Sequence, residues 1–513
     1  MEGLTTDSIR LAGKYAPRRR RPHALVIGAG FGGLAAAVRL GARGYRVTVL
    51  ERLDAPGGRA YVNRQDGFTF DSGPTMVTAP FLLNELWDIG GRKLEDDVQL
   101  RPISPFYRIR FDDGETFDAC GDPQIMRLQV ARFSARDVTG YERFMAASEA
   151  IFRVGFERLG HVPFNSWTDM VRIVPVMMKL ASHRTVYDTV ATYVENPRLR
   201  IALSLHPLLI GGNPFTTTSI YCLIAFLERR WGVHFVMGGT GRLVEGLVQL
   251  IHDQGGLVRC GEEVSAIALR GRTATGAQLA CGDELDADIV VSNVDSAWTY
   301  RYLLPPEVRR RWSNRRIERA RYSMSLFVWY FGTNRRYPDV AHHTMVLGPR
   351  YRELLADIFE RKVLAADFSL YLHRPTATDL SLAPEGCDAF YVLSPVPHLG
   401  SGLDWSRISE SYRCAIARRL QETVLPDLEA HVVTSWVMTP QDFQDRLRSF
   451  RGAAFGLAPM FSQSAWFRPH NRSEDIDRLY LVGAGTHPGA GLPGVLSSAR
   501  VLDAVVPDAR ALV

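Results

Sequence analysis

The 513-residue sequence predicts an α/β fold in which one discontinuous domain carries an inserted β-sheet domain and a helical region. Three observations support this. An apolar strand at 23–27, a glycine turn, an alanine-rich helical stretch and a second strand at 46–51 follow one another near the N-terminus. A strand, a glycine-rich turn and a helix start recur at 479–494. Helices and short strands fill the chain between these two units, which is the pattern of an interrupted α/β domain.

The first unit contains the fingerprint G-x-G-x-x-G at Gly28, Gly30 and Gly33, between a strand and a helix. Gly28 suits a tight turn, Gly30 lets a pyrophosphate approach the backbone, and Gly33 lets the helix pack against the sheet. Glu51 ends the second strand, where an acidic side chain binds a ribose 2′-hydroxyl and repels a 2′-phosphate. This context predicts a Rossmann-like dinucleotide site rather than a plain glycine turn.

Two further glycine-rich segments favour FAD over NAD. The run 56–59 places two glycines beside Arg59, which offers close backbone approach and a cation for a phosphate. The second glycine-rich turn, at 483–494, precedes a helix whose N-terminus can stabilise negative charge on a reduced flavin. Two widely separated glycine turns fit a long ligand that spans the domain.

The remaining elements follow in order. A hairpin is predicted around 107–117, helices over most of 137–254, strands over 257–291, and apolar strands at 323–331 and 387–396. We therefore divide the chain into a basic flexible tail, a discontinuous FAD-binding domain, a substrate domain and a helical region. Their ranges are 1–22 for the tail; 23–100 with 240–300 and 475–510 for the FAD-binding domain; 101–136 with 301–474 for the substrate domain; and 137–239 for the helical region.

Composition excludes several classes of protein. Of the net charge of +6, the tail contributes +4, so no nucleic-acid footprint remains in the body of the chain. The six cysteines are scattered, without C-x-x-C or a histidine cluster at metal spacing, so we expect reduced thiols and no metal site. No signal peptide is expected. The uncharged stretch 202–227 is broken by prolines and glycines, so no transmembrane helix is predicted.

Six segments of the sequence together match the motifs of one family: 26–34, 56–61, 67–74, 209–214, 463–470 and 483–494. On these segments the sequence resembles the bacterial-type phytoene desaturases, over roughly residues 23 to 505. The first fingerprint is shared with all flavoproteins that bind two dinucleotides, whereas the motifs at 463–470 and 483–494 are far more specific.

This resemblance implies FAD-dependent desaturation of phytoene, stepwise to neurosporene or lycopene, by a peripheral enzyme on the cytoplasmic face of a membrane. In such an enzyme we expect the helical region 137–239 to associate with the membrane and to admit the substrate. The substrate is a long apolar carotenoid. The residues implied for FAD are Gly28, Gly30, Gly33, Glu51, Arg59, Val264, Gly485, Thr486, Gly494 and Val495. Oxygen or a quinone is the expected electron acceptor, and homo-oligomerisation is left open.

Hydride transfer to flavin N5 followed by loss of a proton needs little acid–base machinery, and no triad or carboxylate pair is evident. Asp169 is the candidate base with Arg172 as its neighbour, because both match polar residues that the family places near its substrate channel. The alternative is that both are solvated on an amphipathic helix. Apolar residues between Trp167 and Ala181 recur at helical spacing, which indicates either a core face or a surface that dips into membrane or lines a tunnel.

Other readings remain open. The same family includes desaturases of hydroxyneurosporene and diapophytoene. A flavin amine oxidase of the same fold would take a small polar substrate, although amine oxidases usually have an acidic residue where Ala484 or Gly485 stands. A lipid-carrier protein without flavin is disfavoured by the intact glycine motifs and Arg59.

Overall fold

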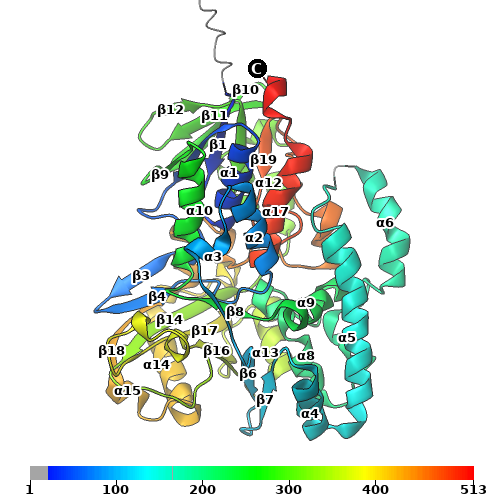
Figure 1. The fold of residues 1–513 in the computed structure, drawn as a ribbon, viewed down its shortest axis with the longest axis vertical. Coiled ribbons are helices and arrows are strands. Elements are labelled where there is room, and N and C mark those ends of the chain that lie inside the picture. The colour runs from blue at the N-terminus through cyan, green and yellow to red at the C-terminus, as the bar shows by residue number, and fades with distance from the viewer. Residues whose placement is uncertain (1–20, 165, 513) are drawn as a thin grey trace, which may run out of the picture.

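The computed structural model describes residues 21–164 and 166–512 and arranges them as sheets flanked by helices (Figure 1). All but the last two residues of the predicted basic tail lie outside the described residues. The fold is a mixed α/β fold with a large second sheet, as predicted.

A five-stranded parallel sheet forms the first layer, in the order β19–β13–β1–β2–β9. It gathers strands from three distant parts of the chain. β1 lies at its centre, where all five residues are buried, because both faces are covered. Ala24 and Val26 pack with helices on one face, and Leu25 and Ile27 pack with strand residues of 267–279 and with residues 297–304 on the other. The strands are β1 (His23–Ile27), β2 (Arg46–Glu51), β9 (Leu257–Cys260), β13 (Ile289–Ser292) and β19 (Leu479–Leu481).

One face of this sheet is covered by α1 (Phe31–Ala42), α10 (Gly241–Asp253) and α17 (Leu492–Val505), which stand side by side in Figure 1. α1 packs closely against both of its neighbours because three consecutive alanines, 35–37, are fully buried and add little bulk. α10 has a regular apolar stripe that includes Leu243, Leu247 and Leu250, all fully buried.

A seven-stranded mixed sheet forms the second layer, in the order β18–β14–β17–β16–β15–β6–β7. The predicted hairpin and both predicted apolar strands are confirmed here. The strands are β6 (Tyr107–Arg110), β7 (Thr116–Ala119), β14 (Ser325–Thr333), β15 (His343–Val346), β16 (Leu370–His373), β17 (Asp388–Val396) and β18 (Val432–Met438).

All nine residues of β14 are buried, because its two faces meet different partners. Phe327, Trp329 and Phe331 pack against α14 (Trp405–Thr423). The alternating residues Leu326, Val328 and Tyr330 point to the opposite face and line a cavity. One face of the large sheet is therefore core and the other is the wall of a cavity.

Three smaller sheets complete the β structure of the described residues. They are β3–β4 (Val62–Gln65 and Phe68–Asp71), β5–β8 (Leu100–Pro102 and His234–Val236) and β10–β11–β12 (Val264–Arg270, Thr273–Leu279 and Glu284–Asp286). The other helices outside the helical region are α2 (Pro80–Ile89), α3 (Leu94–Asp97), α11 (Ser296–Tyr302), α12 (Asn314–Arg319), α13 (Tyr351–Ala356), α15 (Leu428–His431) and α16 (Pro440–Asp445).

Helices predominate between residues 123 and 231, at one side of the molecule in Figure 1. They are α4 (Pro123–Phe133), α5 (Val138–Phe152), α6 (Trp167–Lys179), α7 (Val186–Ala191), α8 (Pro197–Ser204) and α9 (Leu223–Trp231). The apolar stretch 202–227 is broken as predicted, since Gly211 adopts a positive φ of 78° after a short 3-10 helix. Within 21–164 and 166–512, no helix is long and apolar enough to cross a membrane.

Candidate cofactor and substrate cavity

The turn between β1 and α1 has the geometry that its glycines predict. Gly28 has a φ of 95°, and its N–H donates to the carbonyl of Leu50 at 2.7 Å. A Cβ on Gly33 would lie 2.0 Å from the carbonyl oxygen of Gly28, so α1 can start this close to the strand only with glycine there. Gly30 is the N-cap of α1, and no side chain caps it. The N-terminus of α1 is thus suited to an anionic ligand.

Glu51 is buried at the end of β2, directly beside this turn. Its Oε2 accepts a hydrogen bond from the N–H of Ala29 at 2.8 Å, and its Oε1 accepts one from the N–H of Leu53 at 3.0 Å. Burial raises the pKa of Glu51, while the hydrogen bonds from Leu53 and Ala29 oppose the rise. The carboxylate therefore fixes the glycine turn and also lines the cavity next to it.

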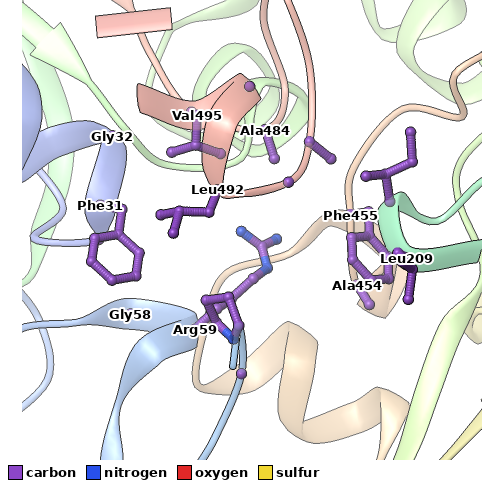
Figure 2. Close-up of a pocket in the computed structure, with 18 of the residues that line it drawn as sticks. Phe31, Gly32, Gly58, Arg59, Leu209, Ala454, Phe455, Ala484, Leu492 and Val495 are labelled. Carbon is purple, nitrogen blue, oxygen red and sulfur yellow. The ribbon is translucent and has the colours of Figure 1, made fainter. Parts of the chain in front are cut away.

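Arg59 projects its guanidinium into the middle of the cavity (Figure 2). Nη2 donates to the Ser449 hydroxyl at 3.0 Å, while the buried Nε has no hydrogen-bond partner among the described residues. Burial lowers the pKa of Arg59, and the carboxylate of Asp295 opposes the effect. An incompletely paired, buried guanidinium favours an anionic group within its reach.

The predicted C-terminal turn forms the wall opposite Arg59, where Figure 2 shows Ala484, Leu492 and Val495. Gly485 and Thr486 lie behind that wall. A Cβ on Gly485 would approach Ser296 Oγ to 2.5 Å, and the Thr486 hydroxyl, fully buried, donates to the carbonyl of Pro469 at 2.5 Å. These two residues shape the turn from within, while their neighbours face the cavity.

Most of the residues implied for FAD line one continuous cavity. They are Gly28, Gly30, Glu51, Arg59, Val264, Gly494 and Val495; Gly33, Gly485 and Thr486 are not in direct contact with it. The uncapped helix N-terminus, the buried carboxylate and the incompletely paired guanidinium fit a dinucleotide with an anionic pyrophosphate.

The cavity continues from this polar end into an apolar part between the large sheet and the helical region. Leu209, Ala454 and Phe455 mark this direction in Figure 2. Its walls include Phe156, Leu205, Leu208, Ile224, Leu227, Leu326, Val328, Met345, Leu347, Leu393, Pro395 and Met438. Such a surface suits a hydrocarbon, because contact with it removes apolar area from water.

The apolar residues of α6 lie on two different sides of the helix. Met170, Ile173 and Met177 line the cavity. The other face of the same helix exposes large apolar side chains: Trp167 (57% exposed), Val171 (52%), Val174 (44%), Val176 (38%) and Met178 (60%). The stripe is thus neither a plain core face nor a single surface, because the helix faces the cavity on one side and solvent on the other.

The two candidate catalytic residues also belong to α6. Arg172 is exposed and is not among the described residues that line the cavity. The side chain of Asp169 lies outside the described residues.

Sequence reasoning missed a buried polar cluster on the cavity wall. Glu228 of α9 lines the cavity, and its Oε2 accepts a hydrogen bond from the Tyr107 hydroxyl at 3.2 Å and lies 3.1 Å from Nε2 of His206. All three residues are at most 4% exposed. The local signal was weak, because Glu228 only ends the uncharged stretch 202–227 and precedes two arginines, and Tyr107 and His206 lie elsewhere in the sequence.

A second set of polar side chains lies on the face of the large sheet that lines the cavity. The Tyr371 hydroxyl lies 2.7 Å from Nδ1 of His343 and 3.3 Å from the hydroxyl of Thr75. His342, His343 and His373 meet in a buried cluster that could offer three nitrogen ligands to a metal ion. Burial lowers the pKa of His342 to about 3, and the charge of Arg374 adds to this effect. Since that arginine would also repel a bound cation, we assign no metal here.

Comparisons with known proteins agree with this geometry. The profile of the flavin containing amine oxidoreductases matches residues 31–501. The chain is 50% identical to the lycopene-forming phytoene desaturase of Pseudescherichia vulneris, over 93% of this chain and 97% of that protein. It is 48% identical to the neurosporene-forming phytoene desaturase of Rhodobacter capsulatus, over 95% and 94% of the two chains.

Similarity is lower to a relative named for a different substrate and to solved structures. The 4,4'-diapophytoene desaturase of Methylomonas is 33% identical, over 93% of this chain and 94% of that protein. A crystal structure of an oxidoreductase from Methanosarcina mazei is 18% identical with a TM-score of 0.61, over 94% of this chain and 100% of that chain. The comparison with the Methanosarcina mazei structure supports the fold alone.

Proposed function

This chain belongs to the flavin-containing amine oxidoreductases and, within them, to the phytoene desaturases, and from that premise we propose that it desaturates phytoene stepwise to neurosporene or lycopene. The observation that carries the proposal is the degree of identity. The lycopene-forming phytoene desaturase of Pseudescherichia vulneris is 50% identical and the neurosporene-forming enzyme of Rhodobacter capsulatus is 48% identical over nearly the whole chain, whereas the diapophytoene desaturase of Methylomonas is 33% identical. Hydroxyneurosporene and diapophytoene are the alternative substrates.

The predicted flavin agrees with the family, and we assign FAD to the polar end of the cavity. Gly28, Gly30 and the N-terminus of α1 would hold the pyrophosphate, Glu51 the adenosine ribose, and Arg59 a phosphate or the flavin side of the ligand. Val264, Gly494 and Val495 would contact the cofactor, while Gly33, Gly485 and Thr486 would hold the two glycine turns in shape. When bound, FAD supplies a two-electron acceptor for a hydride.

The protein itself contributes orientation and exclusion of water. The apolar walls formed by Leu326, Val328 and the leucines of 205–209 would align a straight hydrocarbon and keep water away from the reacting carbons. We assign the substrate role to 101–136 with 301–474, and the FAD role to 23–100 with 240–300 and 475–510. Asp169 and Arg172 remain candidates for a polar role on α6.

We further assign a membrane-facing role to α6 and to the segment 137–239. The support is the outer face of α6, where Trp167, Val171 and Met178 are exposed while Met170 and Met177 of the same helix line the cavity. Transfer of a hydrocarbon through water would cost about 0.8 kcal/mol per CH₂, whereas transfer from lipid into an apolar cavity is nearly neutral. Direct loading from the cytoplasmic face of a bilayer avoids that cost.

The test is incubation of the purified chain with FAD and phytoene-loaded liposomes, followed by absorption spectra of the extracted pigments. Structured visible bands are expected, and their positions count the conjugated double bonds and therefore the steps. Parallel liposomes with diapophytoene or hydroxyneurosporene measure substrate preference. Absence of new bands from a chain that retains FAD would rule out phytoene as the substrate, and amine turnover would then be assayed.

A further inference from the structure

The cluster of Glu228, His206 and Tyr107 has no part in the function described so far, although it lies on the wall of the cavity. Glu228 comes from α9, His206 begins the 3-10 helix His206–Ile210, and Tyr107 begins β6. Next to Glu228 and His206, the chain lines the cavity with Leu205, Leu208, Ile224 and Leu227. A carboxylate is thus set into an otherwise apolar wall.

The two carboxylate oxygens of Glu228 differ in their hydrogen bonds. Oε2 lies 3.2 Å from the Tyr107 hydroxyl, which donates to it, and 3.1 Å from Nε2 of His206. With the His206 proton on Nε2, both neighbours donate to this one oxygen and stabilise its negative charge. Oε1 is buried and has no hydrogen-bond partner among the described residues. A buried carboxylate oxygen without a donor is costly unless it meets a partner during function.

The other described carboxylates on the cavity wall already form hydrogen bonds or ion pairs with protein groups. Glu51 accepts two backbone N–H groups, Asp295 caps α11 through Ala297 and Trp298, and Glu263 pairs with Arg448 at 2.5 Å. Glu262 pairs with Arg259 at 2.5 Å. Of the described cavity-lining residues contributed by 137–239, Glu228 is the one carboxylate.

We infer that Glu228 is the catalytic base of the desaturation, an inference that rests on the proposed function. Loss of a hydride from an allylic C–H bond leaves a carbocation, and the hydride carries its two electrons to the flavin. The adjacent C–H bond then breaks, its electron pair becomes the new C=C bond, and its proton passes to Oε1 of Glu228. His206 and Tyr107 are positioning residues that hold the charge at Oε2.

The apolar surroundings strengthen this role. Because the walls exclude water, a carboxylate attracts a nearby carbocation more strongly than it would in solution. Glu228 would therefore both stabilise the cation that forms after hydride loss and remove its proton. A purely structural role would instead require only the bonds at Oε2, which tie α9, β6 and the 3-10 helix together.

A binding experiment tests the charge without turnover. The probes are a long polyprenyl dimethylamine, which is cationic at neutral pH, and the neutral polyprenyl hydrocarbon of equal length, each added to the FAD-loaded chain in liposomes. Quenching of tryptophan fluorescence, to which the cavity-lining Trp298 and Trp436 contribute, reports occupancy. The unmodified chain should bind the ammonium at least tenfold more tightly, and Glu228→Gln should reduce this preference to about twofold or less. Retention of the full preference in Glu228→Gln overturns the inference.

Further variants test whether Asp169, or the loss of any one carboxylate, explains the ammonium preference instead of Glu228. Asp169→Asn should leave the ammonium preference intact; if it abolishes the preference while Glu228→Gln does not, Asp169 is the base. Glu245→Gln, on an exposed pair with Arg242, controls for the loss of one carboxylate. Glu228→Asp retains the charge but withdraws it by one methylene, so it should retain the ammonium preference while pigment formation falls. This variant also keeps the inference testable if Glu228→Gln fails to fold.

Pigment formation distinguishes failure of this inference from failure of the proposed function. Glu228→Gln should slow desaturation of phytoene by about 10²- to 10⁴-fold, with FAD content and phytoene retention unchanged. Desaturation at the unmodified rate in Glu228→Gln refutes the inference and leaves the proposed function intact. If the unmodified chain desaturates no phytoene but shows a Glu228-dependent ammonium preference, the proposed substrate fails and the charged site stands.

Discussion

The carboxylate of Glu51 accepts a hydrogen bond from the backbone N–H of Ala29 at 2.8 Å, which joins the end of β2 to the glycine turn after β1. Its second oxygen accepts the N–H of Leu53 at 3.0 Å. One buried side chain therefore holds two adjacent strand ends in register at the polar end of the cavity. This arrangement leads to the first prediction.

Glu51→Gln is expected to weaken FAD binding by roughly tenfold and to lower the free energy of unfolding by about 1–2 kcal/mol, because an amide can accept at only one of the two positions. Titration of the apoprotein with FAD, followed by quenching of flavin fluorescence, measures the first effect, and urea denaturation measures the second. Glu245→Gln on the surface of α10 is the control and should change neither value. Unchanged FAD affinity in Glu51→Gln would contradict the assignment.

Gly33→Ala is expected to destabilise the folded chain by more than about 3 kcal/mol, because its Cβ would lie 2.0 Å from a backbone oxygen that cannot move without disrupting the turn. Gly41→Ala in the same helix is a matched control. Its Cβ would approach the end of the Gln254 side chain to 2.1 Å, and that side chain can rotate away. Thermal unfolding of both variants measures the contrast; equal losses would disprove the explanation.

The pH dependence of stability should carry a signature of Asp71. Burial raises its pKa from 3.8 to about 6, against hydrogen bonds from Thr240. Because the folded chain then holds this proton more tightly than the unfolded chain, this group stabilises the fold as the pH falls from about 7 to about 4, by up to about 3 kcal/mol. The difference in unfolding free energy between the unmodified chain and Asp71→Asn should grow by that amount over this range. Urea denaturation at several pH values measures it.

The exposed Asp88→Asn variant is the control for Asp71, because it removes one carboxyl group from the surface of the chain. The difference in unfolding free energy between the unmodified chain and Asp71→Asn could instead stay constant or shrink as the pH falls. Either result would show that burial does not raise the pKa of Asp71.

The membrane-facing role of α6 predicts that a double substitution, Val171→Glu with Met178→Glu, weakens binding to liposomes by at least about tenfold, since two exposed apolar side chains are replaced by charges that resist burial in lipid. FAD content and unfolding temperature should stay unchanged. Flotation of the protein with liposomes measures the binding. Val433→Glu, at an exposed position of β18, is the control. An equal loss of liposome binding in this variant would contradict the membrane-facing role of α6.

The sequence alone determined the features that depend on local backbone conformation and local periodicity. The turn around Gly28, the parallel strands beside it, the hairpin at 107–117 and the second glycine turn are where the pattern predicts them. These features follow from which φ angles a residue permits and which positions alternate in burial, and both are encoded within a few neighbouring residues.

Only the tertiary structure decided which side chains share the cavity. Tyr107 and Glu228, 121 residues apart, meet because β6 and α9 pack together, and no local pattern encodes that approach. Similarly, spacing cannot tell that Met170 faces the cavity while Val171 faces solvent, or that Gly485 lies behind the wall that Ala484 forms. Burial against distant segments sets these directions, so they arise from packing of the whole chain rather than from any short stretch of it.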